Sequence, residues 1–177
     1  GLPYDNSTDE TFYEKEQRSV NGADVSVFVS QSQKDDYRCF YTDDPAQLAK
    51  IRVIHNGVDT AFFTPATDRK RRELKLYHDI DPDDFVIGFV GRLDPIKAVD
   101  RIFHALAKIK EKKKGVTVTI TGEGRSVKYL EGLSRGLGIG DNVHFYGFQT
   151  GSQLLRRYQM ADVGVVPSVL ETFGLCV

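Results

Sequence analysis

The residues best suited to bind an anion lie where a short apolar run ends in glycine and gives way to an amphipathic stretch. Gly91 closes the run, and Arg92 and Lys97 follow it closely. If the run is a buried strand and the stretch a helix, free amides at the helix N-terminus attract an anion and the two basic side chains neutralise it. This arrangement suits one diphosphate group.

The same turn has two alternative interpretations, and both stay open. The basic side chains are equally able to pair with Asp94 or Asp100 as ordinary surface charges. A dinucleotide-binding dehydrogenase also uses a strand, a glycine turn and a helix, but its G-x-G-x-x-G spacing is absent here. Arg92 and Leu93 stand where small glycines would be, which favours capture of phosphate by side chains.

Two further turns follow apolar runs. Gly122-Glu123-Gly124 comes after one of them, and open α/β sheets bind ligands at the carboxyl ends of their strands. Near the end of the chain, Glu171 follows another run and precedes Gly174. An ionised carboxylate accepts hydrogen bonds from several donors, so Glu171 is a candidate ligand for sugar hydroxyls.

Alternating elements are expected to position these turns, because short β-branched runs alternate with amphipathic stretches along the chain. The predicted strands, apolar enough for burial on both faces, are Val25–Ser30, Ile51–Ile54, Phe85–Gly91, Val116–Thr121, Val143–Gly147 and Val163–Pro167. The predicted helices are Glu10–Val20, Gln31–Tyr41, Pro95–Lys112, Val127–Arg135 and Ser152–Ala161. The expected fold class is α/β, a Rossmann-like parallel sheet with flanking helices.

Local signals refine these elements. Asp94 is a plausible N-cap for a helix that starts at Pro95, and Ser152 for the last helix. The lysines that crowd positions 108–114 suit a helix C-terminus better than a nucleic-acid patch. The polar stretch 64–77 is interpreted as a linker or linker-side helix, with a domain boundary near residue 65.

Composition describes an ordinary globular protein. The chain has 177 residues, of which 40% are hydrophobic and 28% charged, and its formal net charge is −1. This balance points to neither nucleic acid nor an anionic membrane as a partner. Cys39 and Cys176 are too few and too far apart for a disulfide framework or a zinc site, which fits a reducing cytosol.

The two ends of the chain lack the signals of natural termini. It begins at Gly1 without a methionine or a signal peptide, and it stops at Val177 inside an apolar stretch. The sequence is therefore expected to be an internal segment of a longer protein. No apolar run approaches the roughly 20 residues that a helix needs to span a bilayer.

Metal binding is not predicted. The acidic run 79–83 contains two D-x-D patterns, but it precedes a predicted strand, whereas a metal-binding D-x-D is expected to follow one. A solvated loop is the favoured interpretation. The four histidines, His55, His78, His104 and His144, show no ligand spacing and are interpreted as structural or surface residues.

Taken together, the ordered motifs resemble the retaining group 1 glycosyltransferases over roughly residues 20–177. Each motif is weak alone, and their order and spacing make the set specific. They are Asn56-Gly57-Val58-Asp59 with Phe62-Phe63 and Pro65, then Val90-Gly91-Arg92-Leu93 with Lys97, then Thr121-Gly122-Glu123-Gly124, then Ala161-Asp162-Val163, and finally Pro167-Ser168 with Glu171-Thr172-Phe173-Gly174.

The resemblance implies a partial GT-B architecture of two facing Rossmann-like domains. Residues 1–65 are then the last part of the N-terminal acceptor domain, and residues 66–177 are most of the C-terminal donor domain. By the same resemblance Arg92 and Lys97 contact the donor diphosphate and Glu171 the sugar, and these are the catalytic candidates. The remaining donor-binding candidates are Gly91, Gly122, Glu123, Gln149 (through its backbone, at the base), Phe173, Gly174 and Leu175.

Two departures from the family pattern stand out. The family usually has glycine after the lysine, whereas this chain has Ala98, which affects close packing of the helix. The family pattern also places a second glutamate, expected to hold the ribose, eight positions after the first, which falls two positions beyond Val177. The segment alone is therefore expected not to turn over.

The activity implied is transfer of a hexose from a UDP-, GDP- or ADP-sugar to a hydroxyl acceptor with retention. No further cofactor and no metal are expected, because Arg92, Lys97 and helix-end amides would stabilise the leaving diphosphate. The acceptor, a glycan, lipid or other hydroxyl compound, would bind the missing part of the N-terminal domain, and the expected location is the cytoplasm or the inner face of a membrane. A GT-B nucleotide-sugar epimerase and a binding-only paralogue remain as alternatives.

Overall fold

The computed structural model describes residues 10–171 and 174. The chain divides into two compact units, Gly1–Gly57 and Val58–Val177, a little before the boundary near residue 65 that the sequence suggested. Within the described residues no helix is both long and apolar enough to cross a membrane.

The unit Gly1–Gly57 is a small α/β layer. Its strands β1 (Ser26–Phe28) and β2 (Ile51–Val53) pair in parallel. The helices are α1 (Glu10–Gly22), α2 (Gln31–Phe40) and α3 (Pro45–Leu48). Ser30 caps α2 by accepting a hydrogen bond from the amide of Gln33. The buried core comprises Val20, Phe28, Tyr37 and Ile51.

The unit Val58–Val177 is built on a four-stranded parallel sheet in the order β5-β4-β3-β6. The strands are β3 (Phe85–Val90), β4 (Val116–Thr121), β5 (Val143–Phe145) and β6 (Val163–Gly164). Every residue of β4 is buried, as its apolar run predicted, because helices cover both faces of the sheet. The expected α/β class with a parallel sheet is confirmed.

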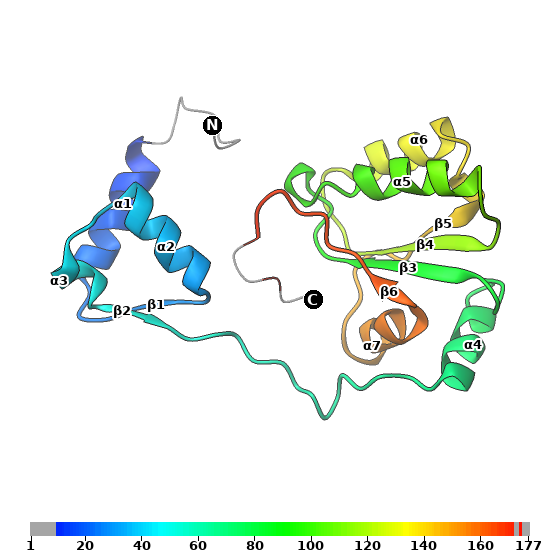
Figure 1. The fold of residues 1–177 in the computed structure, drawn as a ribbon, viewed down its shortest axis with the longest axis horizontal. Helices are drawn as coiled ribbons and strands as arrows, with labels where there is room; N and C mark the ends of the chain where they lie inside the picture. Colours follow the sequence, from blue (N-terminus) through cyan, green and yellow to red (C-terminus); the bar gives the residue numbers. More distant parts are fainter. Residues whose placement is uncertain (1–9, 172–173, 175–177) are drawn as a thin grey trace. The chain divides into compact units, whose positions relative to one another are not determined.

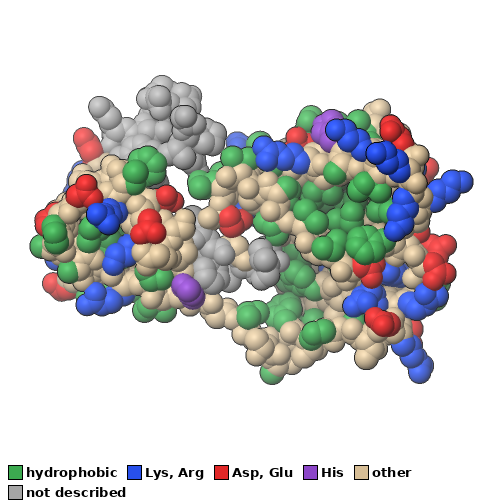
Figure 2. Space-filling model, viewed as in Figure 1, with side chains coloured by type: hydrophobic (Ala, Val, Ile, Leu, Met, Phe, Trp, Pro, Cys, Tyr) green, Lys and Arg blue, Asp and Glu red, His purple; other side chains and the backbone are tan. Residues whose placement is uncertain are grey.

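Helices lie on both faces of this sheet (Figure 1). One face carries α5 (Asp100–Lys110) and α6 (Val127–Gly136), and the other carries α4 (Asp68–Tyr77) and α7 (Gly151–Met160). The largest core cluster joins β3, β4 and α5 through side chains such as Phe89, Val118 and Phe103. On the visible face, charged side chains of both signs are interspersed around this unit (Figure 2).

The single helix predicted over 95–112 is wrong in one respect. Pro95–Lys97 forms a short 3-10 turn, and α5 starts only at Asp100. Between them Ala98 adopts a left-handed conformation, with φ of 49° and ψ of 39°. That conformation breaks a right-handed helix at this residue. Asp94 precedes the turn as expected, but its side chain makes no capping hydrogen bond.

Smaller corrections concern element ends. The predicted cap Ser152 lies inside α7, whose N-cap position is Thr150. Strand β6 ends at Gly164, although the sequence suggested a strand reaching Pro167. The stretch interpreted as a linker or linker-side helix contains α4, capped by Thr67. Polar helices of this kind carry little periodic signal, so packing decides their bounds.

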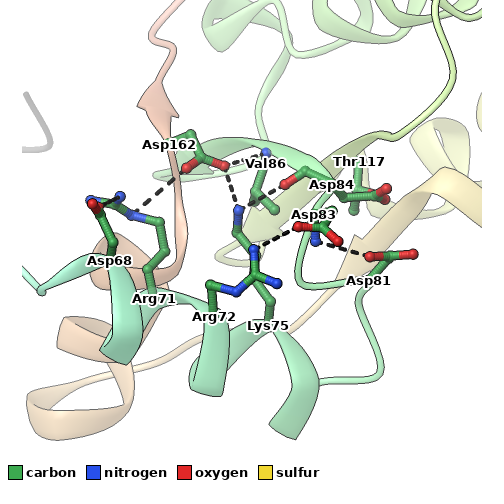
Figure 3. A network of polar contacts seen from close by, with 10 residues as sticks. All are labelled: Asp68, Arg71, Arg72, Lys75, Asp81, Asp83, Asp84, Val86, Thr117 and Asp162. Atoms are coloured by element: carbon green, nitrogen blue, oxygen red, sulfur yellow. Dashed lines mark hydrogen bonds and ion pairs between the residues drawn. The ribbon is translucent and has the colours of Figure 1, made fainter.

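A buried polar network fixes α4 against the sheet (Figure 3). The Lys75 ammonium donates to the Asp162 carboxylate and to the Asp84 carbonyl, both at 2.7 Å. The same carboxylate accepts from the amide of Val86 at 2.8 Å. Lys75 is only 4% exposed, and a buried charge needs a counter-charge. The Asp162 carboxylate supplies it. The Asp162 motif therefore ties α4 to the amino ends of β3 and β6.

Candidate functional site

The carboxyl ends of β3, β4 and β5 carry loops that are joined to one another by backbone hydrogen bonds. The amide of Gly91 donates to the carbonyl of Thr121 at 3.0 Å, and that of Leu93 donates to Glu123 at 2.8 Å. The amide of Gly122 donates to Gly147 at 2.8 Å. These bonds form one continuous ledge at the edge of the sheet where α/β proteins bind ligands.

Glycine is required at this ledge by protein packing. A Cβ atom on Gly122 would lie 1.9 Å from the Gly91 carbonyl oxygen, and one on Gly124 would lie 2.5 Å from that of Leu93. The amides of Gly91 and Leu93 are also engaged within the protein. The expectation that the turn after β3 points free amides outward is therefore wrong for these two groups.

Two of the predicted site residues meet across a long stretch of sequence. The Lys97 ammonium contacts the Glu171 carboxylate at 2.6 Å, with side chains 17% and 32% exposed. The Ser168 hydroxyl donates to the same Glu171 oxygen at 3.2 Å. The amide of Val169 donates to the Ile96 carbonyl at 2.8 Å, which attaches the segment after β6 to the Pro95–Lys97 turn.

The electrostatics of Glu171 follow from these contacts. The hydrogen bond from Lys97 holds the pKa of the Glu171 carboxyl below its ordinary value, while partial burial acts in the opposite direction. Smaller contributions come from Ser168 and the backbone of Gly174. Glu171 is consequently an anion at neutral pH, able to accept hydrogen bonds from hydroxyl groups.

Arg92 lies apart from this pair. Its guanidinium contacts the Asp94 carboxylate at 3.3 Å, and the side chain is 76% exposed. Arg125 approaches the same carboxylate at 3.8 Å from the loop after β4. Pairing with Asp94 is the alternative raised for Arg92 from the sequence. Such an exposed pair contributes little to stability, so both guanidinium groups are free to reorient.

The other candidates lie around the same edge. Glu123 is exposed on the ledge, next to Gly122. Gln149 follows β5, and its side-chain amide donates to the carbonyl of Tyr146 at 2.8 Å. Gly174 has a φ of 77°, a conformation that glycine adopts readily. Phe173 and Leu175 lie outside the described residues.

The acidic run before β3 is occupied by protein contacts. Asp83 pairs with Arg72 at 2.6 Å, Asp81 accepts from the amide of Asp83, and Asp84 accepts from Thr117. Among the described residues no group of three or more His, Cys, Asp and Glu side chains is arranged to hold a metal ion. The structure thus gives these carboxylates local partners.

Sequence reasoning missed two buried cations, Lys75 and Arg157. Both lie in polar helices, and both are followed within a few residues by buried apolar positions. The available signal was the motif residue Asp162, because a carboxylate directly before a predicted strand suggests a nearby cation. Nothing local distinguishes Arg157 from its exposed neighbour Arg156.

The sequence of this unit matches a known protein family. Residues 70–177, more than half of the chain, match the model of the family "Glycosyl transferases group 1". The chain belongs to this family. Within it, the ledge, Lys97 and Glu171 all fall in the matched region.

Similar proteins carry glycosyltransferase names. The chain is 34% identical over 160 residues to a D-inositol 3-phosphate glycosyltransferase of Segniliparus rotundus, covering 88% of this chain and 34% of that protein. A protein of the same name from Actinosynnema mirum is 35% identical over 169 residues, covering 90% of this chain and 39% of its own. The chain therefore spans about a third of the length of the curated relatives it matches.

Solved structures share the fold. HepE of Anabaena, in complex with UDP and glucose, aligns with a TM-score of 0.81 at 22% identity, over 94% of this chain and 44% of that one. Sucrose-phosphate synthase from Thermosynechococcus elongatus also gives 0.81, at 24% identity, over 98% of this chain and 42% of that one. The group 1 glycosyl transferase segment thus has the fold of these larger proteins.

Proposed function

We propose that the full-length protein transfers a hexose from a nucleoside-diphosphate sugar to a hydroxyl acceptor, with retention at the anomeric carbon. The observation that carries this proposal is the contact between Lys97 and Glu171 at the carboxyl edge of the sheet. It places a cation suited to phosphate beside a carboxylate suited to sugar hydroxyls. A nucleotide sugar presents these two groups next to each other.

Lys97 has the central electrostatic role in the proposed reaction. Negative charge grows on the departing diphosphate as the glycosidic bond breaks, and a cation already held in place stabilises that charge with little reorganisation. Lys97 is held by Glu171 and by the turn on which it lies. Arg92, exposed and weakly paired, supplies a second cation that can move onto the phosphate oxygens.

Glu171 is proposed to select the sugar. Its carboxylate is anchored on one side by Lys97 and Ser168, both on the oxygen Oε2. Because each carboxylate oxygen can accept more than one hydrogen bond, the group can also accept from donor hydroxyls beside the contact from the Gly174 backbone. Backbone groups of the ledge, near Gly122, Glu123 and Gln149, would contact the nucleotide. Phe173 and Leu175 are proposed to contact the donor substrate, as the sequence resemblance implies.

The substrates proposed for testing follow from the relatives. UDP-glucose is the first donor to examine, because solved complexes of the structural neighbour HepE contain UDP or UDP-glucose. D-inositol 3-phosphate is the first acceptor, because several relatives carry it in their names. GDP- and ADP-sugars, and glycan or lipid acceptors, complete the panel.

We propose a cytoplasmic location, or one at the inner face of a membrane.

The test uses the full-length protein. A panel of UDP-, GDP- and ADP-sugars is compared by thermal shift, because a ligand that binds the native state raises its stability. Initial rates are then measured with and without an acceptor. Release of nucleoside diphosphate only with an acceptor supports the transferase, whereas release without one supports an epimerase-like reaction, and binding without release supports a binding-only protein.

The same assay tests metal dependence. Since two basic side chains serve the diphosphate in this proposal, activity in EDTA should equal activity without chelator. The stereochemistry of the product is read from the anomeric proton by NMR. An inverted product, or activity lost in EDTA and restored by magnesium or manganese, contradicts the proposed mechanism.

A further inference from the structure

A small cavity lies between α7 and the sheet, away from the Lys97–Glu171 contact. Its volume is about 100 Å³, and its wall includes the carboxyl-terminal half of β3, Thr119 and Thr121 of β4, and Arg157 of α7. Thr119 and Thr121 are 1% and 2% exposed. A cavity with polar groups in its wall and this volume holds an ion and a few waters, since one water occupies roughly 30 Å³.

The wall of this cavity contains a buried cation, Arg157, two of whose donor atoms have no hydrogen-bond partner among the described residues. Arg157 is 9% exposed, and its Nε and Nη1 atoms are buried with no hydrogen-bond acceptor among the described residues. The hydroxyl of Thr121 is likewise buried and without a partner there. The guanidinium carbon lies 3.6 Å from the centre of the Tyr146 ring, so one face of the group is stacked. The Nε and Nη1 donors, at the edge of the guanidinium, still lack an acceptor.

No described carboxylate neutralises Arg157. Asp162 also lines the cavity, but its carboxylate is committed to Lys75 and to the amide of Val86. Burial lowers the pKa of the Arg157 guanidinium, Tyr146 opposes this effect, and the positive charge of Arg156 adds to it. A guanidinium stays charged at any ordinary pH, so a buried one without a counter-charge is costly.

We propose that this cavity is a structural site for one monovalent anion of about the size of chloride. The anion accepts hydrogen bonds from Arg157 and from the hydroxyl of Thr121, and it supplies the missing negative charge. Because Thr121 is the last residue of β4 and precedes Gly122, the bound anion joins α7 to the strand that carries the ledge. The site is independent of the proposed transferase activity.

The donor substrate does not fit this cavity. Pockets for ligands of that size are about 300–1,000 Å³, several times larger than the 100 Å³ available here. A doubly charged phosphate or sulfate would need more than one cation, and Arg157 is the one basic side chain among the described residues in the wall. Charge and volume together favour a halide-sized monovalent ion.

The test compares sodium chloride with sodium gluconate at equal ionic strength, because gluconate is monovalent but too large for the cavity. The full-length wild-type protein should melt about 3 °C higher in chloride when chloride is near ten times its Kd. Arg157→Met should abolish this difference. Arg156→Met is the matched control: it removes the same charge from the neighbouring, exposed position and should keep the full difference.

Two further measurements keep the proposal testable if Arg157→Met does not fold. Thr121→Val removes one hydroxyl while keeping a similar shape, and it should reduce the chloride-dependent rise. Crystals grown in bromide should show an anomalous peak beside Arg157. A wild-type protein that melts equally in both salts, an equal rise in Arg157→Met, or a water without anomalous signal at that position would each overturn the proposal.

Discussion

Two lysine–carboxylate pairs flank the same two neighbouring strands, β3 and β6, and they differ in what else holds them. Before the strands, the side chains of Lys75 and Asp162 are 5% and 19% exposed, and both make further hydrogen bonds to backbone groups. After the strands, Lys97 and Glu171 are 17% and 32% exposed, and the lysine ammonium has no second acceptor among the described residues. The distances, 2.7 and 2.6 Å, are almost equal.

The length of an ion pair therefore does not reveal its role. A buried pair whose other donors and acceptors are also bonded within the protein stabilises the fold. Removing one partner leaves the other as an unpaired buried charge. A pair that is more exposed can exchange partners with a ligand at lower cost. Substitutions at the two pairs and beside them should expose this difference, with effects that range from several kcal/mol to less than about 1 kcal/mol.

The largest effect is expected at the amino ends of the strands. Asp162→Ala leaves the Lys75 ammonium buried without its counter-charge, which should lower the free energy of unfolding by about 3–5 kcal/mol. Denaturant titration of the full-length protein measures this loss. The control is Asp83→Ala, which breaks the exposed pair with Arg72 and should cost far less than Asp162→Ala. Equal losses in the two variants would show that burial does not make the Lys75–Asp162 pair more important for stability than an exposed pair.

A kinetic effect is expected at the carboxyl ends. If Lys97 stabilises the leaving diphosphate as proposed, Lys97→Ala should lower kcat about a hundredfold, in the range found for single preorganised donors. Donor binding should weaken much less, and stability should change little. Arg92→Ala should follow the same pattern with a smaller loss, because its side chain is more exposed. Unchanged kcat with weaker donor binding would remove either residue from catalysis.

Glu171→Gln should affect transfer without affecting the nucleotide. One lost charge-assisted hydrogen bond to the sugar is worth about 1.5–3 kcal/mol, which corresponds to about a tenfold or greater loss of rate. The Kd of the free nucleoside diphosphate, measured by calorimetry, should stay within a few-fold. If diphosphate affinity fell as steeply as the rate, Glu171 would be supporting the nucleotide site and not the sugar.

The smallest effect is expected at Ala98, beside Lys97. A left-handed conformation costs a non-glycine residue about 1–2 kcal/mol, and glycine removes this cost. Glycine also removes a buried methyl group and increases the conformational entropy of the unfolded chain, and these two effects together destabilise the folded protein by a similar amount. Ala98→Gly should therefore change the free energy of unfolding by less than about 1 kcal/mol, as measured by denaturant titration. A loss well above this value would show that the Ala98 side chain is needed to hold the turn.

Sequence patterns predicted all six strands and their order, because β-branched runs are strong local signals, but the predicted strands were mostly longer than the observed ones. They placed Lys97 and Glu171 in one site through motif order alone. They did not predict that Gly91 and Gly122 would serve packing between two loops, since a glycine after a strand suits a ligand and a neighbouring backbone equally.

The remaining errors have a common physical cause. The left-handed Ala98 breaks the predicted helix because the path of the chain there is set by tertiary contacts, against local preference. Arg156 and Arg157 are adjacent and identical in type, and only the rotation of α7 on the sheet decides which one is buried. Long-range packing of this kind leaves no trace in a short window of sequence.

The division between Gly57 and Val58 has a practical consequence for engineering. Every core cluster of the described residues lies wholly on one side of it, and residues 54–62 around it are exposed. A chimera joined at this point would exchange one unit for that of a relative without cutting a packed interior. Family members could thus be recombined at a single junction that leaves each described core cluster intact.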